Sequence, residues 1–83
     1  MTQTSLSAFL KILPELSSRQ SEVLGGFAQF DSANDKMVAL ALDLGINQVT
    51  PRRGELVEKG VLEWAGEYPC PYSRVKTTYW RVA

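Results

Sequence analysis

The change of periodicity at Gly60 constrains the fold of this chain more than any other feature of its sequence. Before this glycine, apolar residues recur at the spacing of amphipathic helices. After it they follow a strand-like pattern, rich in β-branched and aromatic residues. With 83 residues the chain has room for a single core. The sequence therefore predicts one α+β domain over residues 1–83, mainly helical, with a two-stranded C-terminal β-hairpin.

A short leading helix is expected over residues 1–14. Its apolar residues fall at i, i+3, i+4 and i+7 before Pro14 ends the pattern, and they are Leu6, Phe9, Leu10 and Leu13. Two roles are open for this stripe: it forms a homodimer interface, or it completes the core of the monomer.

A three-helix core is expected over residues 17–60. Ser17 and Gln20 have the spacing of a capping box at the start of its first helix, whose expected buried residues are Val23, Leu24, Phe27 and Phe30. Gly25 and Gly26 lie inside this helix, where each costs up to about 1 kcal/mol relative to alanine. They indicate close packing against a neighbouring helix or, alternatively, a local bend.

The next helix follows the turn "FDSAND", which supplies cap residues in Asp31, Ser32 and Asn34. It is nearly all apolar and is therefore expected to be central, with Met37, Val38, Ala41, Leu42 and Leu44 on its apolar positions. Gly45 is expected to adopt the left-handed conformation that closes a helix. Two short helices joined at this glycine predict a helix-turn-helix.

The last helix contains "VTPRRGELVEKG", and its start is ambiguous. It begins at Thr50, with Pro51 in the first turn, or near Ile46, with a distortion at Pro51. Val49, Leu56 and Val57 are expected to face inward, and Gly60 to end the helix.

Polar side chains gather at the N-terminal end of this last helix. In a helix-turn-helix this end enters the major groove, where Asn and Gln suit adenine and Arg suits guanine. The predicted base-reading residues are Asn47, Gln48, Thr50 and Arg52. Cationic residues of the same helix and of the hairpin are predicted to hold DNA phosphates, and they are Arg53, Arg74 and Lys76.

The hairpin is expected over residues 61–83, with a long tip in "GEYPCPYSR". Trp64, Tyr79 and Trp80 are expected to pack in the sheet and the core, because one face of a lone hairpin must be covered. Helices followed by such a hairpin have the chain order of a winged helix.

Charge and composition exclude several classes of function. Nine Lys and Arg residues balance nine Asp and Glu residues, which argues against an indiscriminate nucleic-acid binder, although residues 44–83 carry six basic and four acidic residues. The chain has no histidine and a single cysteine, Cys70, so we expect no enzyme, metal or cofactor. No stretch approaches the roughly 18 apolar residues of a membrane span, so a cytoplasmic location is expected.

Three motifs resemble one family along nearly the whole chain. They follow the patterns "LS-x-R-Q-x-x-V", "I-N-x-V-T-P-R-x-x-E-L-x-x-x-G" and an aromatic-ended hairpin. The matching residues are Leu16, Ser17, Arg19, Gln20, Val23, Ile46, Asn47, Val49, Thr50, Pro51, Arg52, Glu55, Leu56, Gly60, Ala65, Gly66, Cys70, Arg74, Trp80 and Arg81. The chain thus resembles the small winged-helix proteins of bacteriophages and prophages, relatives of the MarR-type transcription regulators.

This resemblance implies sequence-specific binding of double-stranded DNA in a bacterial host cell, in a transcriptional or replication-associated role. A membrane and a small-molecule substrate are not expected as partners. The departures from the family pattern are Arg53, Gly54 and the hairpin tip "CPYSR". The alternative is a winged-helix module that has lost DNA binding and binds protein.

Overall fold

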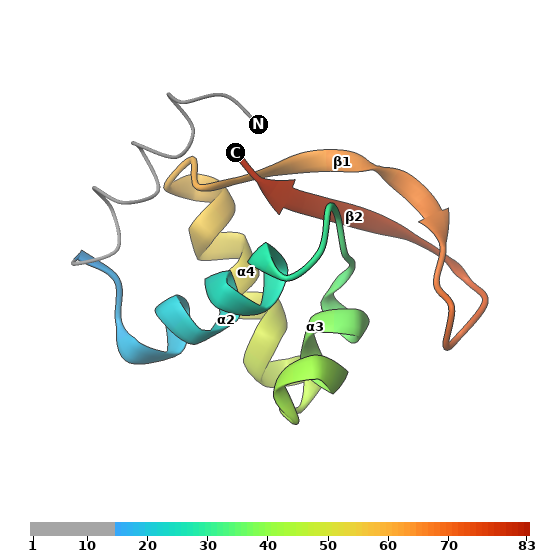
Figure 1. The fold of residues 1–83 in the computed structure, drawn as a ribbon, viewed down its shortest axis with the longest axis horizontal. Helices are drawn as coiled ribbons and strands as arrows, with labels where there is room; N and C mark the ends of the chain where they lie inside the picture. The colour runs from blue at the N-terminus through green and yellow to red at the C-terminus, as the bar shows by residue number, and fades with distance from the viewer. Residues whose placement is uncertain (1–14) are drawn as a thin grey trace.

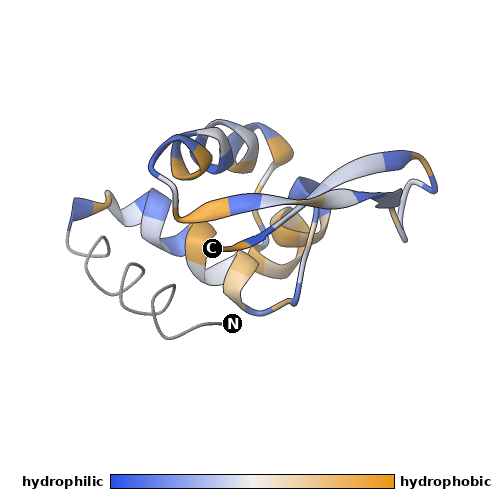
Figure 2. Cartoon of the chain, turned by 90° about the horizontal axis from the view of Figure 1, so that it is seen from above, coloured by the Kyte–Doolittle hydropathy of each residue, from blue (hydrophilic) through white to orange (hydrophobic). Residues whose placement is uncertain are grey.

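The computed structural model describes residues 15–83 and has an α+β, mainly helical fold (Figure 1). Within these residues the elements are α2 (Ser18–Ala28), α3 (Asp35–Leu42), α4 (Ile46–Glu58), β1 (Leu62–Pro69) and β2 (Lys76–Val82). The two strands form one antiparallel sheet, and their hairpin extends to one side of the helices as a long arm (Figure 2). The predicted leading helix and its apolar stripe (Leu6, Phe9, Leu10 and Leu13) lie outside the described residues.

The capping box predicted for α2 is confirmed. The Gln20 backbone N–H donates to Ser17 Oγ at 3.1 Å, and the Ser17 backbone N–H donates to Gln20 Oε1 at 2.9 Å. These two bonds satisfy donors that the first turn of a helix otherwise leaves unpaired. The buried side of α2 carries Val23, Leu24 and Phe27 as predicted, while Phe30 packs against the core from a partly buried position.

The two glycines of α2 have different surroundings. A Cβ atom on Gly26 would lie 2.7 Å from Val38 Cγ1 and 2.9 Å from Leu42 Cδ1, whereas a Cβ atom on Gly25 would meet nothing within 4 Å. The predicted close packing is therefore confirmed for Gly26 alone. Gly26 lies in the contact between α2 and α3.

The prediction that α3 is a central helix is wrong. Its buried residues are Val38 and Ala39, whereas Leu40 and Ala41 are exposed. One side of α3 packs on α2 and α4 and the other faces solvent, so its apolar sequence overstates its burial. The Asn34 cap is confirmed, because Asn34 Oδ1 accepts a hydrogen bond from the Met37 backbone N–H at 2.8 Å.

The turn between α3 and α4 differs from the prediction at Gly45. The left-handed residue that closes α3 is Asp43, with φ of 57°, and Gly45 has φ of −72° and caps the start of α4. The Leu44 backbone N–H donates to the Ala39 carbonyl at 2.8 Å and completes the helix end. Aspartate adopts the left-handed region more readily than most side chains, so a glycine is not required there.

Helix α4 begins at Ile46, and Pro51 lies inside it. Of the two predicted starts, the one near Ile46 is therefore confirmed. Gly60 has φ of +80° and ends the helix as predicted, with its backbone N–H donating to the Val57 carbonyl at 3.0 Å. Val49 and Leu56 are buried, and Val57 is partly buried.

The hairpin pairs Leu62 with Val82 at its base and Pro69 with Lys76 near its tip. Its register shifts between Trp64 and Gly66, where Gly66 has φ of +119°, a conformation that favours glycine. Ala33 extends the sheet on the other side of β2: its backbone N–H donates to the Trp80 carbonyl at 2.9 Å, and its carbonyl accepts from the Trp80 backbone N–H at 2.8 Å. Strand β2 is therefore flanked on both sides, and β1 is an edge strand.

The aromatic residues of the hairpin divide between core and surface. Tyr79 is buried and Trp80 packs against the core from a partly buried position, as predicted. Trp64 is 61% exposed, so its predicted core position is wrong. It lies on the edge strand opposite Trp80, and it is Trp80 that contacts α4.

Candidate nucleic-acid interface

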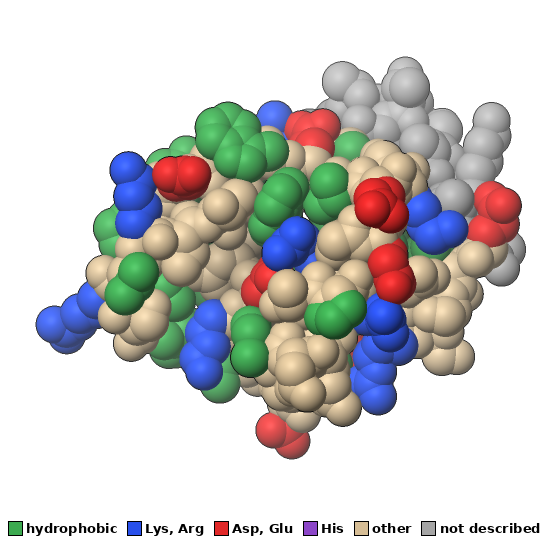
Figure 3. Space-filling view, turned by 180° about the vertical axis from the view of Figure 1, so that it is seen from behind, with side chains coloured by type: hydrophobic (Ala, Val, Ile, Leu, Met, Phe, Trp, Pro, Cys, Tyr) green, Lys and Arg blue, Asp and Glu red, His purple; other side chains and the backbone are tan. Residues whose placement is uncertain are grey.

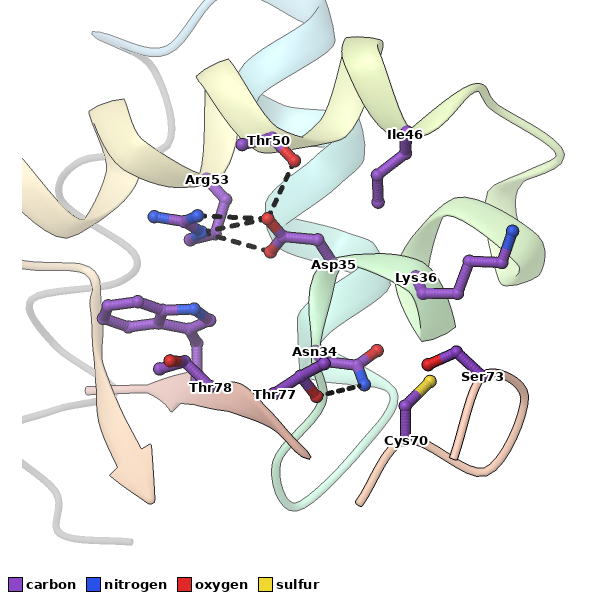
Figure 4. A pocket seen from close by; sticks show the side chains of 11 residues that line it. Asn34, Asp35, Lys36, Ile46, Thr50, Arg53, Cys70, Ser73, Thr77 and Thr78 are labelled. Carbon is purple, nitrogen blue, oxygen red and sulfur yellow. Dashed lines mark hydrogen bonds and ion pairs between the residues drawn. The ribbon is translucent and has the colours of Figure 1, made fainter. Parts of the chain in front are cut away.

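One open pocket of about 570 Å³ separates α4 from the hairpin tip (Figure 4). Helix α4 contributes Ile46, Thr50 and Arg53, and the hairpin contributes residues on both sides of its tip. The first residues of α3 close the pocket on a third side. The N-terminal half of α4 and the hairpin tip, which the sequence predicts as the two parts of a DNA-binding surface, therefore flank the same hollow.

The uncharged residues predicted to read bases are exposed on α4. Asn47, Gln48 and Thr50 all reach solvent. Gln48 Oε1 accepts a hydrogen bond from the Gly45 backbone N–H at 3.2 Å, and within residues 15–83 its amide N–H groups donate to no protein acceptor. Thr50 Oγ1 instead donates to Asp35 Oδ2 at 2.9 Å. Asn47 and Gln48 are thus the side chains best placed to contact a partner.

Arg52 is held on the side of α4 that faces α2. Its Nη2 donates to Glu55 Oε2 at 2.9 Å, and Gln20 Nε2 donates to Glu55 Oε1 at 2.7 Å. The hydrogen bond from Gln20 and the adjacent Arg52 lower the pKa of the Glu55 carboxyl, so this group is ionised at neutral pH. Arg52 Nε is buried without a hydrogen-bond partner. The charge of Arg52 is largely compensated within the monomer.

Arg53 lies in an internal contact rather than at the surface position expected for a phosphate contact. Its Nε and Nη2 each donate to the Asp35 carboxylate at 3.1 Å, and its guanidinium carbon lies 4.7 Å from the centre of a Trp80 ring. The contact joins α4, α3 and β2, and we call Asp35, Arg53 and Trp80 the clamp (Figure 4). The sequence gives no signal for it, because Asp35 and Arg53 meet only through tertiary packing.

The cations of the hairpin tip are exposed. Arg74 has φ of 64°, and Lys76 begins β2. Lys36, on the rim of the pocket, was not among the predicted site residues. Within residues 15–83 none of these three side chains forms an ion pair. The view from behind shows basic and acidic side chains interspersed, without an extended basic patch (Figure 3).

Cys70 lies at the floor of the pocket and is buried. The backbone N–H and the hydroxyl of Ser73 lower the pKa of its thiol from 9.0 to about 7, because they stabilise the thiolate. We expect the ultraviolet absorbance of the thiolate to titrate near pH 7, and Ser73→Ala to raise this midpoint. Cys70→Ala is the control that must abolish the titration.

The lowered pKa of the Cys70 thiol also predicts how the free energy of unfolding depends on pH. Between pH 7 and 9 the unfolded state binds more protons at Cys70 than the folded state does, so the free energy of unfolding should rise with pH. Chemical denaturation of wild type and Cys70→Ala across this window measures the effect. An identical pH dependence for both proteins would contradict it.

The described residues contain no group of three or more His, Cys, Asp or Glu side chains that could hold a metal ion. Among these residues, no helix has the length and apolar character required to cross a membrane. The chain matches no protein-family model, no curated protein and no solved structure.

Proposed function

We propose that this protein binds double-stranded DNA as a winged helix, either as a monomer or as a homodimer. In this proposal the N-terminal half of α4 enters the major groove, and the hairpin is the wing that approaches phosphates. The most fitting role is that of a transcriptional or replication-associated regulator of a phage or prophage, acting in the bacterial cytoplasm.

The order of elements supports this proposal. Along the chain, helix α2 is followed by Ala33, which pairs with β2 as a single bridging residue. Helices α3 and α4 come next, and the antiparallel hairpin of β1 and β2 comes last. This is the layout expected of a winged helix, in which a third short strand lies beside the hairpin. Helices α3 and α4 would then form the helix-turn-helix.

The exposed end of α4 is the observation on which the proposal mainly depends. Asn47 and Gln48 are exposed there, and Arg74 and Lys76 lie on the hairpin beyond the neighbouring pocket. Amide side chains suit the edge of adenine, and unpaired cations suit phosphates. Arg52 and Arg53 make weaker candidates than the sequence indicates, since both are engaged by carboxylates of the monomer.

The salt dependence of DNA binding tests the proposal. For binding to a random duplex, the logarithm of affinity should fall with the logarithm of salt concentration by about 0.9 per phosphate neutralised. We expect the double variant Arg74→Ala/Lys76→Ala to reduce this slope by roughly 1.8, because two phosphate contacts are lost. Fluorescence anisotropy with a labelled duplex provides the measurement.

Two control variants test whether the salt dependence arises from contacts of the hairpin and whether α4 contacts bases. Arg19→Ala removes a cation from α2, outside α4 and the hairpin, and should leave the slope unchanged. Gln48→Ala should weaken binding to a selected sequence more than binding to a random duplex, because it removes a base contact. Absence of any binding by the wild type at low salt would refute the proposal.

A protein-binding module that does not bind DNA is the second candidate. It is favoured by the neutral net charge, by the carboxylate partners of Arg52 and Arg53, and by the exposure of six large apolar side chains within residues 15–83. These side chains are Leu40, Ile46, Trp64, Tyr68, Tyr72 and Val75. Co-purification of a defined partner, with DNA affinity absent or insensitive to Arg74→Ala/Lys76→Ala, would favour this candidate.

A further inference from the structure

The outer half of the hairpin exposes apolar side chains that the core does not use. In residues 68–76, which we call the outer hairpin, every residue except Cys70 is exposed. Six large apolar side chains are exposed in the described part of the chain, and three of them lie in this short segment: Tyr68, Tyr72 and Val75. Tyr72 is 60% exposed. Apolar side chains gathered in one exposed segment indicate a surface that binds a partner.

The backbone of the outer hairpin is held by hydrogen bonds. The Cys70 backbone N–H donates to the Val75 carbonyl at 2.9 Å, and the Arg74 backbone N–H donates to the Cys70 carbonyl at 2.7 Å. The hydroxyl of Tyr79, a buried residue, donates to the Pro69 carbonyl at 3.0 Å. The exposed side chains therefore project from a backbone whose conformation is already fixed, and little of it needs ordering when a ligand binds.

The ring of Tyr68 is also fixed in place. It lies over the backbone of Gly66, where a Cβ atom would be 2.7 Å from the Tyr68 hydroxyl oxygen and 2.8 Å from its Cε2. Its centre lies 5.2 Å from the centre of the Tyr79 ring, and the two rings are perpendicular. Tyr68 is nevertheless 51% exposed. It thus presents a positioned aromatic surface to solvent.

The charge of the outer hairpin is positive. Residues 68–76 contain two basic and no acidic residues. Both basic residues, Arg74 and Lys76, are exposed and form no ion pair within residues 15–83. The arm carries them to one side of the helices (Figure 1). The segment therefore combines aromatic side chains with uncompensated cations, which favours a partner that is both aromatic and anionic.

Unpaired nucleotides have this combination of properties. Each base has a flat face that stacks on an aromatic side chain, and each phosphate carries a negative charge. In a duplex the base faces are stacked on one another, so side chains in the grooves reach only the base edges. The exposed rings of the outer hairpin are therefore better matched to an unpaired strand than to a duplex.

We propose that the outer hairpin is a binding site for a single strand of nucleic acid. Unpaired bases stack on Tyr72 and Tyr68, and the adjacent phosphates lie against Arg74 and Lys76. The site goes beyond the binding of duplex DNA through α4. It rests on the proposed function only in taking the same two cations as phosphate contacts.

Fluorescence anisotropy with a labelled oligothymidylate and with a blunt duplex of equal length tests the site. The wild type should bind the single strand saturably. Tyr72→Leu should weaken this binding by about tenfold, the effect of losing one stacked base, whereas Tyr72→Phe should retain it. Trp64→Leu also replaces an aromatic residue by leucine at similar exposure, 61%, but outside the outer hairpin, and should leave the affinity unchanged.

Two further measurements separate stacking from charge. A 2-aminopurine base in the strand changes its fluorescence when it stacks, and this change should be lost in Tyr72→Leu even at saturating protein. The double variant Arg74→Ala/Lys76→Ala should instead reduce the dependence of log affinity on log salt concentration by about 1.4, at roughly 0.7 per phosphate contact with a single strand. Tyr68→Leu should weaken binding as Tyr72→Leu does, and circular dichroism establishes that each variant is folded.

An oligouridylate distinguishes the source of the strand. Binding of either strand supports the site, and the tighter of the two identifies it as DNA or RNA. Absence of saturable binding of both strands, or equal losses of affinity in Tyr72→Leu and Trp64→Leu, would overturn the proposal. An equal loss of duplex affinity in Tyr72→Leu would also overturn it. Duplex and single strand are titrated separately, so failure to bind the duplex alone counts against the proposed function and not against this site.

Discussion

Asp35→Ala is expected to lower the free energy of unfolding by about 2–3 kcal/mol, the largest effect of any single charge removal in the described part of the chain. Only 15% of the Asp35 side chain and 22% of the Arg53 side chain are exposed. Removing the carboxylate leaves a largely buried guanidinium without its partner and deprives Thr50 of its acceptor. Urea denaturation followed by circular dichroism measures the loss.

The exposed pair of Arg19 and Glu22 is the matched control. Its side chains are 40% and 45% exposed, and water and salt screen their attraction. Glu22→Ala should therefore change the unfolding free energy by less than about 1 kcal/mol. The double variant Asp35→Ala/Arg53→Met should recover most of the stability lost in Asp35→Ala, because it no longer contains an unpaired buried charge. No recovery would mean that the clamp acts by packing alone.

Gly26→Ala is expected to destabilise the protein by about 1–3 kcal/mol. The added Cβ atom would lie 2.7 Å from Val38 Cγ1, so α2 and α3 must move apart. Val38 is β-branched and buried, and its methyl group cannot turn aside freely. The intrinsic helix preference of alanine, about 1 kcal/mol over glycine, offsets only part of this strain. Thermal and chemical denaturation measure the net change.

The neighbouring glycine provides the opposite expectation. A Cβ atom on Gly25 meets nothing within 4 Å, so Gly25→Ala should stabilise the protein by up to about 1 kcal/mol through helix preference alone. The two variants have the same chemical change in the same helix and differ only in what faces it. If both variants shifted stability in the same direction, the close contact of α2 with α3 would not be the reason for Gly26.

The clamp also bears on the proposed function. It joins the N-terminus of α3, the middle of α4 and strand β2, so it sets the position of α4 relative to the hairpin. Base contacts from α4 and phosphate contacts from the hairpin would have to fit one duplex together. Arg53 would then serve DNA binding by positioning these elements rather than by touching a phosphate.

Local signals in the sequence predicted most of the elements. The capping box of Ser17 and Gln20, the Asn34 cap and the Gly60 terminus all depend on residues a few positions apart, and the structure confirms each of them. The change from helix to hairpin after Gly60 is confirmed in the same way. Errors arose where a local pattern was compatible with two outcomes. Apolar residues along α3 indicated a central helix, although Leu40 and Ala41 face solvent.

The candidate site was only partly predictable. The exposure of Asn47 and Gln48 follows from the amphipathic pattern of α4, and it was expected. The hydrogen bonds of Thr50 and Arg53 to Asp35 were not predicted from the sequence, because these partners are 15 and 18 positions apart. The predicted dimer stripe on residues 1–14 stays a prediction, as does the choice between DNA and a protein partner.

The sequence by itself determined where helices begin and end, since caps, glycine conformations and periodicity act over one or two turns of the chain. Only the tertiary structure decided which charges are free. Arg53 is neutralised by Asp35, a carboxylate 18 positions away that packing brings to it, whereas Arg74, Lys76 and Lys36 have no such partner within residues 15–83. The energy of a charge depends on its neighbours in space and on its exposure to water, and neither is a property of the local sequence.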